Sequence, residues 1–174
     1  RQCGANRLWF QPRSYRPADL EHDLNRLPDG CWLVLPVQCT EPELHGIRRA
    51  AETAKLGGVV AQSMGQISFA DHWPVFFGDA LPATNRRALE ALRELPVSGF
   101  TLWPEWTEQE QRELMPLPLP ALCPVYGRER LMILNHCPAR VREGLSHGRE
   151  ACRLCRTPDQ ACGQTEPVLR DQRG

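Results

Sequence analysis

Short apolar runs alternate with helical patterns from the start of the chain to about residue 135, and this alternation limits the fold more than any other feature. The run 32–37 is almost entirely apolar, which is typical of a parallel strand buried on both faces. The strand-like runs are residues 7–11, 32–37, 59–61, 74–78, 99–103 and 121–125, and a further apolar run, 131–134, follows a turn at Gly127. Strands that alternate with helices indicate parallel β/α units joined by right-handed connections.

The helical patterns begin at recognised start signals. Pro17 opens a segment in which leucines recur at helical spacing up to Leu27. Thr40 is the predicted N-cap of the next helix, because Glu43 three residues later completes a capping box. The predicted helices span residues 17–27, 40–55, 85–95 and 107–114, with Thr84 and Thr107 as caps of the last two, and residues 64–72 form a loop or a short helix.

Two architectures accommodate such a series of parallel strands: an open doubly wound sheet, or part of a (β/α)8 barrel. We favour the barrel, because the strands are short and evenly spaced and no glycine-rich phosphate loop is present. The predicted fold class is α/β, a partial TIM-like (β/α) barrel followed by a small Cys-rich loop module. Residues 1–135 are expected to form the C-terminal half of the barrel, and residues 136–174 the Cys-rich metal or iron–sulfur module.

Charge and hydropathy argue against several classes of protein. The 21 basic residues balance 21 acidic ones, which argues against a nucleic-acid binder that works by charge alone. The sequence has no apolar run of about 18 residues, so no membrane association is expected. Half of the cysteines cluster in one segment, and the chain is long enough to build a core without disulfides, so we expect a reduced, cytoplasmic protein. Because the first residue is Arg1 and the last residues stop abruptly, we expect a fragment whose nearest partner is the rest of its own barrel.

Four cysteines near the C-terminus give the strongest chemical signal: Cys137, Cys152, Cys155 and Cys162. Cys152 and Cys155 form a Cys-x-x-Cys pair, which can bring two thiolates to one metal from a single turn. The outlying two can then complete a four-ligand shell, and neighbouring arginines would lower the pKa of the thiols. Thiolates hold iron–sulfur clusters and zinc alike, so the spacing leaves both open. Free or disulfide-linked thiols are the remaining alternative.

The other cysteines and the tryptophans carry weaker predictions. Cys31 and Cys123 lie in apolar runs and are predicted to be small core residues. Cys39, at a strand end, is a weak candidate for a nucleophile. The tryptophans are predicted to pack in the core, with Trp106 as the one candidate for a base-stacking or peptide-binding surface.

A second set of candidate site residues lies at the ends of the predicted strands. In a β/α barrel these ends face the active site, and Asp79 and Glu105 are carboxylates at such positions. We expect them to be catalytic, and the alternative is capping of the helices that follow, because acidic groups favour the positive end of a helix. Other polar side chains occupy similar places: Gln11, Arg13, Gln38, Gln62 and Asn85.

The sequence contains no recognised hydrolase motif. Both H-E-x-x-H and G-x-S-x-G are absent from it. Glu43 and His45 lie two residues apart at a helix start, which is poor geometry for sharing a zinc ion. The residues alone therefore give a metalloprotease little support.

Several segments of the chain carry a likeness to one family. The combination of Tyr126-Gly127-Arg128, then Leu131-Met132, then His136-Cys137-Pro138 and the cysteine cluster is the most specific of them. The weaker segments are residues 64–66, 74–79, 85–92, 101–105 and 169–174. In these segments the chain resembles the collagenase-like peptidase family, the U-type peptidases, whose members include RNA- and quinone-hydroxylation proteins.

The resemblance implies a TIM-like barrel and two competing activities. One is the hydrolysis of peptide bonds. The other is the hydroxylation of an RNA base or a quinone precursor, dependent on a four-iron four-sulfur cluster bound by four cysteines. Because no hydrolase motif is present, we expect an iron–sulfur enzyme that hydroxylates an RNA base or a small aromatic substrate. The alternatives are a peptidase that acts on peptide substrates and a zinc-stapled module that binds RNA or protein.

Overall fold

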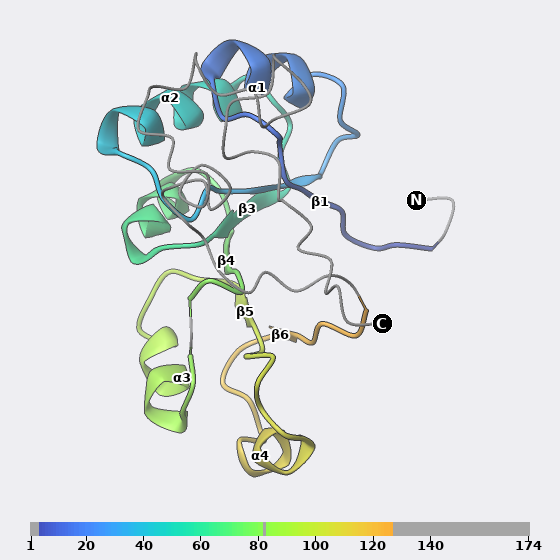
Figure 1. Ribbon diagram of the computed structural model, residues 1–174, viewed down its shortest axis with the longest axis vertical. Coiled ribbons are helices and arrows are strands. Elements are labelled where there is room, and N and C mark those ends of the chain that lie inside the picture. Colours follow the sequence, from blue (N-terminus) through green and yellow to red (C-terminus); the bar gives the residue numbers. More distant parts are fainter. Residues whose placement is uncertain (1–3, 82, 127–174) are drawn as a thin grey trace, which may run out of the picture. The chain divides into compact units, whose positions relative to one another are not determined.

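The computed structural model describes residues 4–81 and 83–126 (Figure 1). Six short strands form one parallel sheet in which each strand pairs with the next along the chain. The strands are β1 (Trp9–Phe10), β2 (Trp32–Val34), β3 (Gly58–Ala61), β4 (Val75–Phe77), β5 (Gly99–Thr101) and β6 (Ala121–Leu122). The helices are α1 (Pro17–Leu24), α2 (Glu41–Glu52), the 3-10 helix η1 (Met64–Asp71), α3 (Arg86–Leu92) and α4 (Glu108–Glu113).

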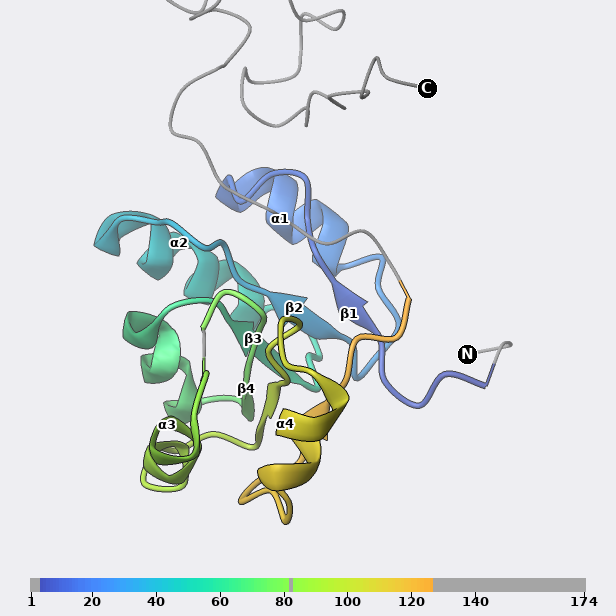
Figure 2. The same ribbon diagram turned by 60° about the horizontal axis from the view of Figure 1, so that its bottom comes forward.

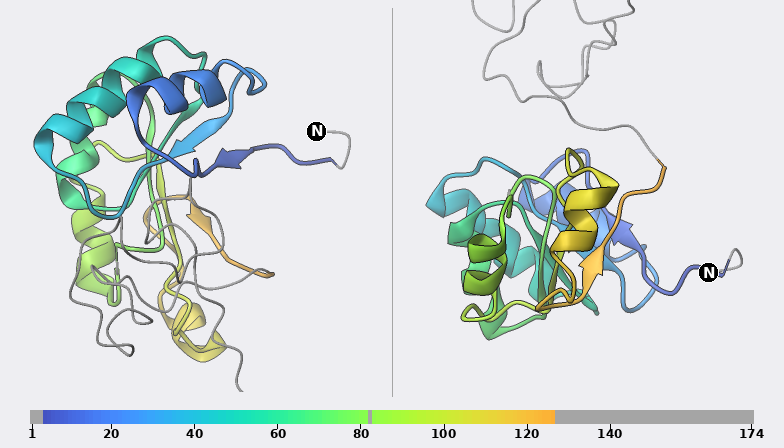
Figure 3. Two further views of the ribbon diagram at one scale, coloured as in Figure 1. Left: turned by 45° about the horizontal axis from the view of Figure 1, so that its top comes forward. Right: turned by 90° about the horizontal axis from the view of Figure 1, so that it is seen from below.

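The strand order distinguishes between the two predicted architectures. A doubly wound sheet reverses its strand order where the chain crosses from one half to the other. Here the order is β1-β2-β3-β4-β5-β6 without reversal, and the sheet curls into a half-barrel, running from the blue strand to the orange one (Figure 3). The α/β class is confirmed, the curled sheet is compatible with a partial β/α barrel, and the doubly wound alternative is excluded.

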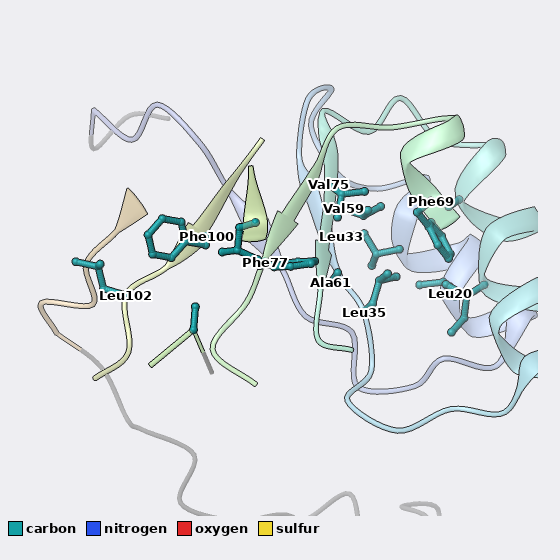
Figure 4. Close-up of a cluster of buried hydrophobic side chains, with 14 of the residues drawn as sticks. Leu20, Leu33, Leu35, Val59, Ala61, Phe69, Val75, Phe77, Phe100 and Leu102 are labelled. Carbon is teal, nitrogen blue, oxygen red and sulfur yellow. The ribbon is translucent and has the colours of Figure 1, made fainter. Parts of the chain in front are cut away.

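The main core lies between the helices and one face of the sheet (Figure 2, Figure 4). Successive strand residues point to opposite faces, so alternate residues of each strand meet the helices. Leu33, Val59 and Phe77 face this side and are almost fully buried. The helical side chains that pack on them are mostly leucine, isoleucine and alanine at helical spacing: Leu20, Leu24, Ile47, Ala50, Ala51, Leu89 and Leu92.

The opposite, inner face of the sheet is filled by its own aromatic side chains. Trp32 and Phe76 are buried there in a second cluster. In the strand register Trp32 lies beside Gly58, and Phe76 lies beside Gly99. A Cβ atom on Gly58 would lie 2.6 Å from the Trp32 ring, and one on Gly99 would collide with the Phe76 ring. Each large ring thus requires a glycine on the neighbouring strand, and the Arg7 guanidinium covers the Trp32 ring at 4.5 Å.

The helix starts agree with the capping predictions except at α3. Thr40 caps α2, and its backbone N–H donates to Glu43 Oε2 at 2.7 Å, which completes the predicted capping box. Thr107 caps α4 as expected. The prediction of Thr84 as the cap of α3 is wrong, because Asn85 is the N-cap and its Oδ1 accepts a hydrogen bond from Ala88 N at 2.9 Å.

Three helices end about a turn before their predicted ends, at Leu24, Glu52 and Leu92. Beyond these ends, backbone N–H groups donate to the carbonyl three residues earlier in the sequence instead of four. Leu27 N donates to Leu24 O, and Leu95 N donates to Leu92 O in the same way. Such 3-10 turns satisfy the last carbonyl groups of a helix. The helical spacing of apolar residues therefore continues for about one turn beyond the end of each α-helix.

Parts of the predicted organisation lie outside the described residues. These are the apolar run 131–134, the boundary between residues 135 and 136, and the Cys-rich module that follows it. Within the part of the chain that the structure describes, no helix has the length and hydrophobicity that a membrane crossing requires.

Candidate functional site

The carboxyl ends of the parallel strands lie at one edge of the sheet, called here the C-terminal edge. Five segments lie there because each follows a strand of the parallel sheet: residues 11–16, 35–40, 62–63, 78–81 and 102–107. In β/α barrels, loops at this edge carry the reactive side chains, while the opposite edge serves stability. The C-terminal edge is therefore the candidate site of this protein.

Asp79 and Glu105 lie beyond the adjacent strands β4 and β5, at the C-terminal edge. Both side chains are exposed, and Glu105 Oε2 accepts a hydrogen bond from Trp103 Nε1 at 3.3 Å. The N-caps of the helices that follow are Asn85 and Thr107. Neither carboxylate is therefore the N-cap of the helix that follows it, and the fold places both on neighbouring loops at one edge.

Gln66 is a buried amide that the sequence analysis did not count among the candidate site residues. It lies in η1 with 1% of its surface exposed. Its Oε1 accepts hydrogen bonds from Gln62 N at 2.7 Å and Ser63 N at 3.2 Å, and its Nε2 donates to Pro36 O at 2.6 Å. One side chain thus joins the segment after β2 to the segment after β3. The Ser63-x-x-Gln66 pattern at the start of η1 is a capping box, and this signal could have identified the residue.

Gln62, Thr101 and Gly78 form the polar row of the inner face nearest the C-terminal edge. Gln62 is 5% exposed and Thr101 is 6% exposed. Gln62 Oε1 accepts a hydrogen bond from Ala80 N at 3.0 Å, and Thr101 Oγ1 donates to Phe77 O at 3.2 Å. The other buried side chains of the inner face are apolar. Gln62 and Thr101 therefore make the inner face polar only next to the C-terminal edge.

The other predicted strand-end residues divide into exposed and structural ones. Gln11, Arg13 and Gln38 are exposed at the C-terminal edge. Asn85 has the structural role of capping α3. Cys39 is half-buried, and its Sγ lies 3.7 Å from Gln66 Nε2. The fold places Cys39 at the same edge as the carboxylates, with an amide donor beside its sulfur.

Two sequence predictions about packing are wrong. Cys123 is exposed, because it follows β6 at the rim of the sheet, where no described helix covers it. Trp106 is only 9% exposed and belongs to the main core. Its Nε1 donates to Thr84 O at 3.3 Å, which ties the loop after β5 to the loop after β4. Trp106 therefore offers no stacking surface, while the prediction that Cys31 is buried is confirmed.

Among the residues that the structure describes, hydrogen bonding lowers the pKa of two carboxyl groups, and both are structural. The backbone N–H and the hydroxyl of Thr40 lower the pKa of Glu43 below its ordinary value of 4.5. Thr107 lowers the pKa of Glu110 in the same way. Both acids belong to capping boxes, so these shifts mark helix starts rather than a reactive site.

The predicted metal ligands Cys137, Cys152, Cys155 and Cys162 lie outside the described residues. Among residues 4–81 and 83–126, no three histidine, cysteine, aspartate or glutamate side chains gather closely enough to hold a metal ion. An open depression of about 410 Å³ lies at the other edge of the sheet, before β4 and β5, and includes Trp73 and Ser98. It shares no residue with the C-terminal edge.

Comparison with known proteins gives no further assignment: no family model, no curated protein and no solved structure matches this chain. The likeness to the collagenase-like peptidase family therefore stays a prediction that rests on the motifs in the sequence.

Proposed function

We propose that this protein is an iron–sulfur enzyme that hydroxylates an RNA base or a small aromatic substrate at the C-terminal edge of a TIM-like barrel. One observation carries the proposal. The sheet brings the carboxylates of Asp79 and Glu105 to one edge, beyond adjacent parallel strands, in a chain that also contains a four-thiol set. This edge is where β/α barrels place their chemistry.

The donor set of the Cys-rich segment fits the proposed cofactor. Cys137, Cys152, Cys155 and Cys162 supply four thiolates, which is the ligand set of a four-iron four-sulfur cluster. When bound, such a cluster supplies one-electron chemistry. Zinc accepts the same donors, so metal analysis of the protein must separate the two.

The carboxylates have a defined task in this reaction. Hydroxylation converts a C–H bond into C–O–H by transfer of an oxygen atom from an oxygen-donor co-substrate, which gains the two electrons that the substrate loses. No net proton is released, but a proton must leave the carbon and return to the new hydroxyl oxygen. A carboxylate within reach of the substrate can hold that proton in between. Glu105 suits this task because the Trp103 N–H fixes one of its oxygens, and Asp79 lies on the neighbouring loop.

The proposal includes completion of the barrel. Within the described residues β1 and β6 are the two outermost strands of the sheet. Closing a barrel requires further strands that pair with both of them. The rest of its own barrel is therefore the nearest partner of this chain, and the substrate, whether RNA or a small molecule, is the other. The cytoplasm is the compartment that we propose for a cluster held by thiolates.

A paired assay tests the reaction. The anaerobically prepared full chain is incubated with RNA or with a small aromatic acid and an oxygen-donor co-substrate, and products are examined by mass spectrometry. Gelatin and casein cleavage is measured in parallel. We expect one added oxygen atom in the first assay and its loss in Glu105→Ala, while Glu108→Ala, an exposed acid in α4, serves as the control. Cleavage of gelatin or casein that requires Glu105 would replace this proposal with the peptidase alternative.

A further inference from the structure

Gln62 is a buried polar residue that directly follows β3. Ala61, Phe77 and Phe100 are partners in the strand register and face the helices. Because side chains alternate between faces, the residues that follow them form a row on the inner face. That row consists of Gln62, Gly78 and Thr101. It is the row of the inner face nearest the C-terminal edge.

The amide of Gln62 lies flat against Gly78. A Cβ atom on residue 78 would lie 2.5 Å from Gln62 Nε2, 2.7 Å from its Cδ and 2.8 Å from its Oε1. The orientation of the amide is fixed, because Ala80 N–H can only donate and therefore faces the oxygen, Oε1, at 3.0 Å. Gln66 Oε1 holds the backbone N–H of the same residue. Gln62 is thus fixed at its backbone and at its amide oxygen.

The amide nitrogen, by contrast, has no acceptor within the described part of the chain. Only 5% of the Gln62 surface is exposed, so solvent has little access to this donor. Buried polar groups in native proteins almost always have a hydrogen-bond partner, and one that lacks a partner calls for an explanation. The amide itself fills the space that a side chain at Gly78 would take, and the neighbouring Thr101 hydroxyl donates to the Phe77 carbonyl.

We infer that Gln62 Nε2 donates a hydrogen bond to a carbonyl or carboxylate oxygen of the ligand at the C-terminal edge. An amide NH2 group can only donate, so its partner must be an acceptor. The oxygen belongs either to a base carbonyl or to the carboxylate of a small aromatic acid. Gly78 keeps the amide in place, because any side chain there would displace it. The inference rests on the proposed function for the position of the ligand, and it depends neither on the cluster nor on the reaction.

Nuclear magnetic resonance of the ¹⁵N-labelled full chain observes the Gln62 side-chain NH2 signals directly. Uridine and benzoate are titrated separately, so that a base carbonyl and a small carboxylate are distinguished. We expect a saturable shift of the Gln62 signals with one of them. The signals of Gln109, an exposed amide that donates to Glu113, should stay unchanged. Gln62 signals that respond to neither probe, including the case in which neither binds, would overturn the inference.

A single-atom change supplies the second measurement. Gln62→Glu keeps an oxygen for Ala80 N–H and replaces the free donor with an acceptor. We expect binding of the responding probe to weaken roughly tenfold or more, since the ligand oxygen loses its donor and faces a negative charge. Gln109→Glu is the matched control and should bind as the wild type does. Unchanged affinity in a folded Gln62→Glu protein would refute the inference, and the wild-type titration decides if the variant does not fold. Iron content and oxygen incorporation are measured independently, so a failure here leaves the proposed function standing.

Discussion

Replacing Gln66 with methionine tests whether one buried amide holds the C-terminal edge together. Methionine has a similar length and volume but cannot hydrogen-bond in its place. The change leaves Gln62 N, Ser63 N and Pro36 O without their partner. An orphaned buried group costs about 1–3 kcal/mol. Taking the middle of that range for the buried Gln62 N and the lower end for the two part-buried groups, we expect the free energy of unfolding to fall by about 3–5 kcal/mol.

Urea denaturation of the full chain, followed by tryptophan fluorescence, measures this loss. The matched control is Gln109→Met in α4, where an exposed amide donates to Glu113 at 3.0 Å. A surface change of this kind alters stability by about 0.5 kcal/mol or less. If the free energy of unfolding of Gln66→Met lies within about 1 kcal/mol of that of the control, the three hydrogen bonds do not contribute the expected stability.

The remaining predictions concern packing, capping and pH. Gly99→Ala places a Cβ against the phenyl ring of the neighbouring strand and should destabilise by about 1–3 kcal/mol, whereas Gly65→Ala, with open space around the new atom, should stabilise slightly in the same urea titration. Asn85→Ala should cost about 1 kcal/mol by loss of the α3 cap, and equal effects of Asn85→Ala and Thr84→Ala would contradict the assignment of the cap. The hydrogen bonds from Thr107 lower the pKa of Glu110 below its ordinary value of 4.5. They therefore stabilise the folded state fully at pH values above 4.5, and this stabilisation is lost as the pH falls through the lower pKa of the folded state. Glu110→Gln should therefore show a shallower acid-induced loss of stability, and an unchanged acid profile would show that this hydrogen bond does not contribute.

Local signals in the sequence predicted most of the secondary structure. The apolar run at 32–37 and its five counterparts all contain strands. The four central strands, β2 to β5, are buried along their whole length, and a strand buried on both faces requires such a composition. The Thr40 and Glu43 pair predicted a helix start, since both hydrogen bonds of a capping box form within one turn. The choice of a barrel over a doubly wound sheet followed from short, even spacing, and the uninterrupted strand order agrees with it.

Predictions failed where the outcome depends on residues far away in the sequence. Cys123 lies in an apolar run, yet it is exposed because its strand is at the rim of the sheet. Trp106 resembles a surface aromatic beside a charged residue, yet it is buried by contacts with the preceding β/α unit. Gln66 joins two segments of the C-terminal edge through its hydrogen bond to Pro36 O, and Pro36 lies 30 positions away in the sequence. Local pattern cannot reveal such partners, because they meet only when the sheet has assembled.

The site divides in the same way. The position of Asp79 and Glu105 was predictable, because parallel strands place their carboxyl ends at one edge whatever the details of the loops. The row formed by Gln62, Gly78 and Thr101 was not, because it depends on the register between three strands. The reason for a glycine at position 78 cannot be read from the sequence, because it depends on the amide of Gln62 packing against that residue.

Metal analysis of the anaerobically purified full chain tests the central claim most directly. Iron, sulfide and zinc are measured together with the visible spectrum, for the wild type, for Cys152→Ala/Cys155→Ala and for a Cys39→Ala/Cys123→Ala control. We predict a brown protein whose iron, sulfide and visible absorption disappear in the first variant and persist in the control. A colourless protein that contains zinc, or a protein with no metal at all, would contradict it.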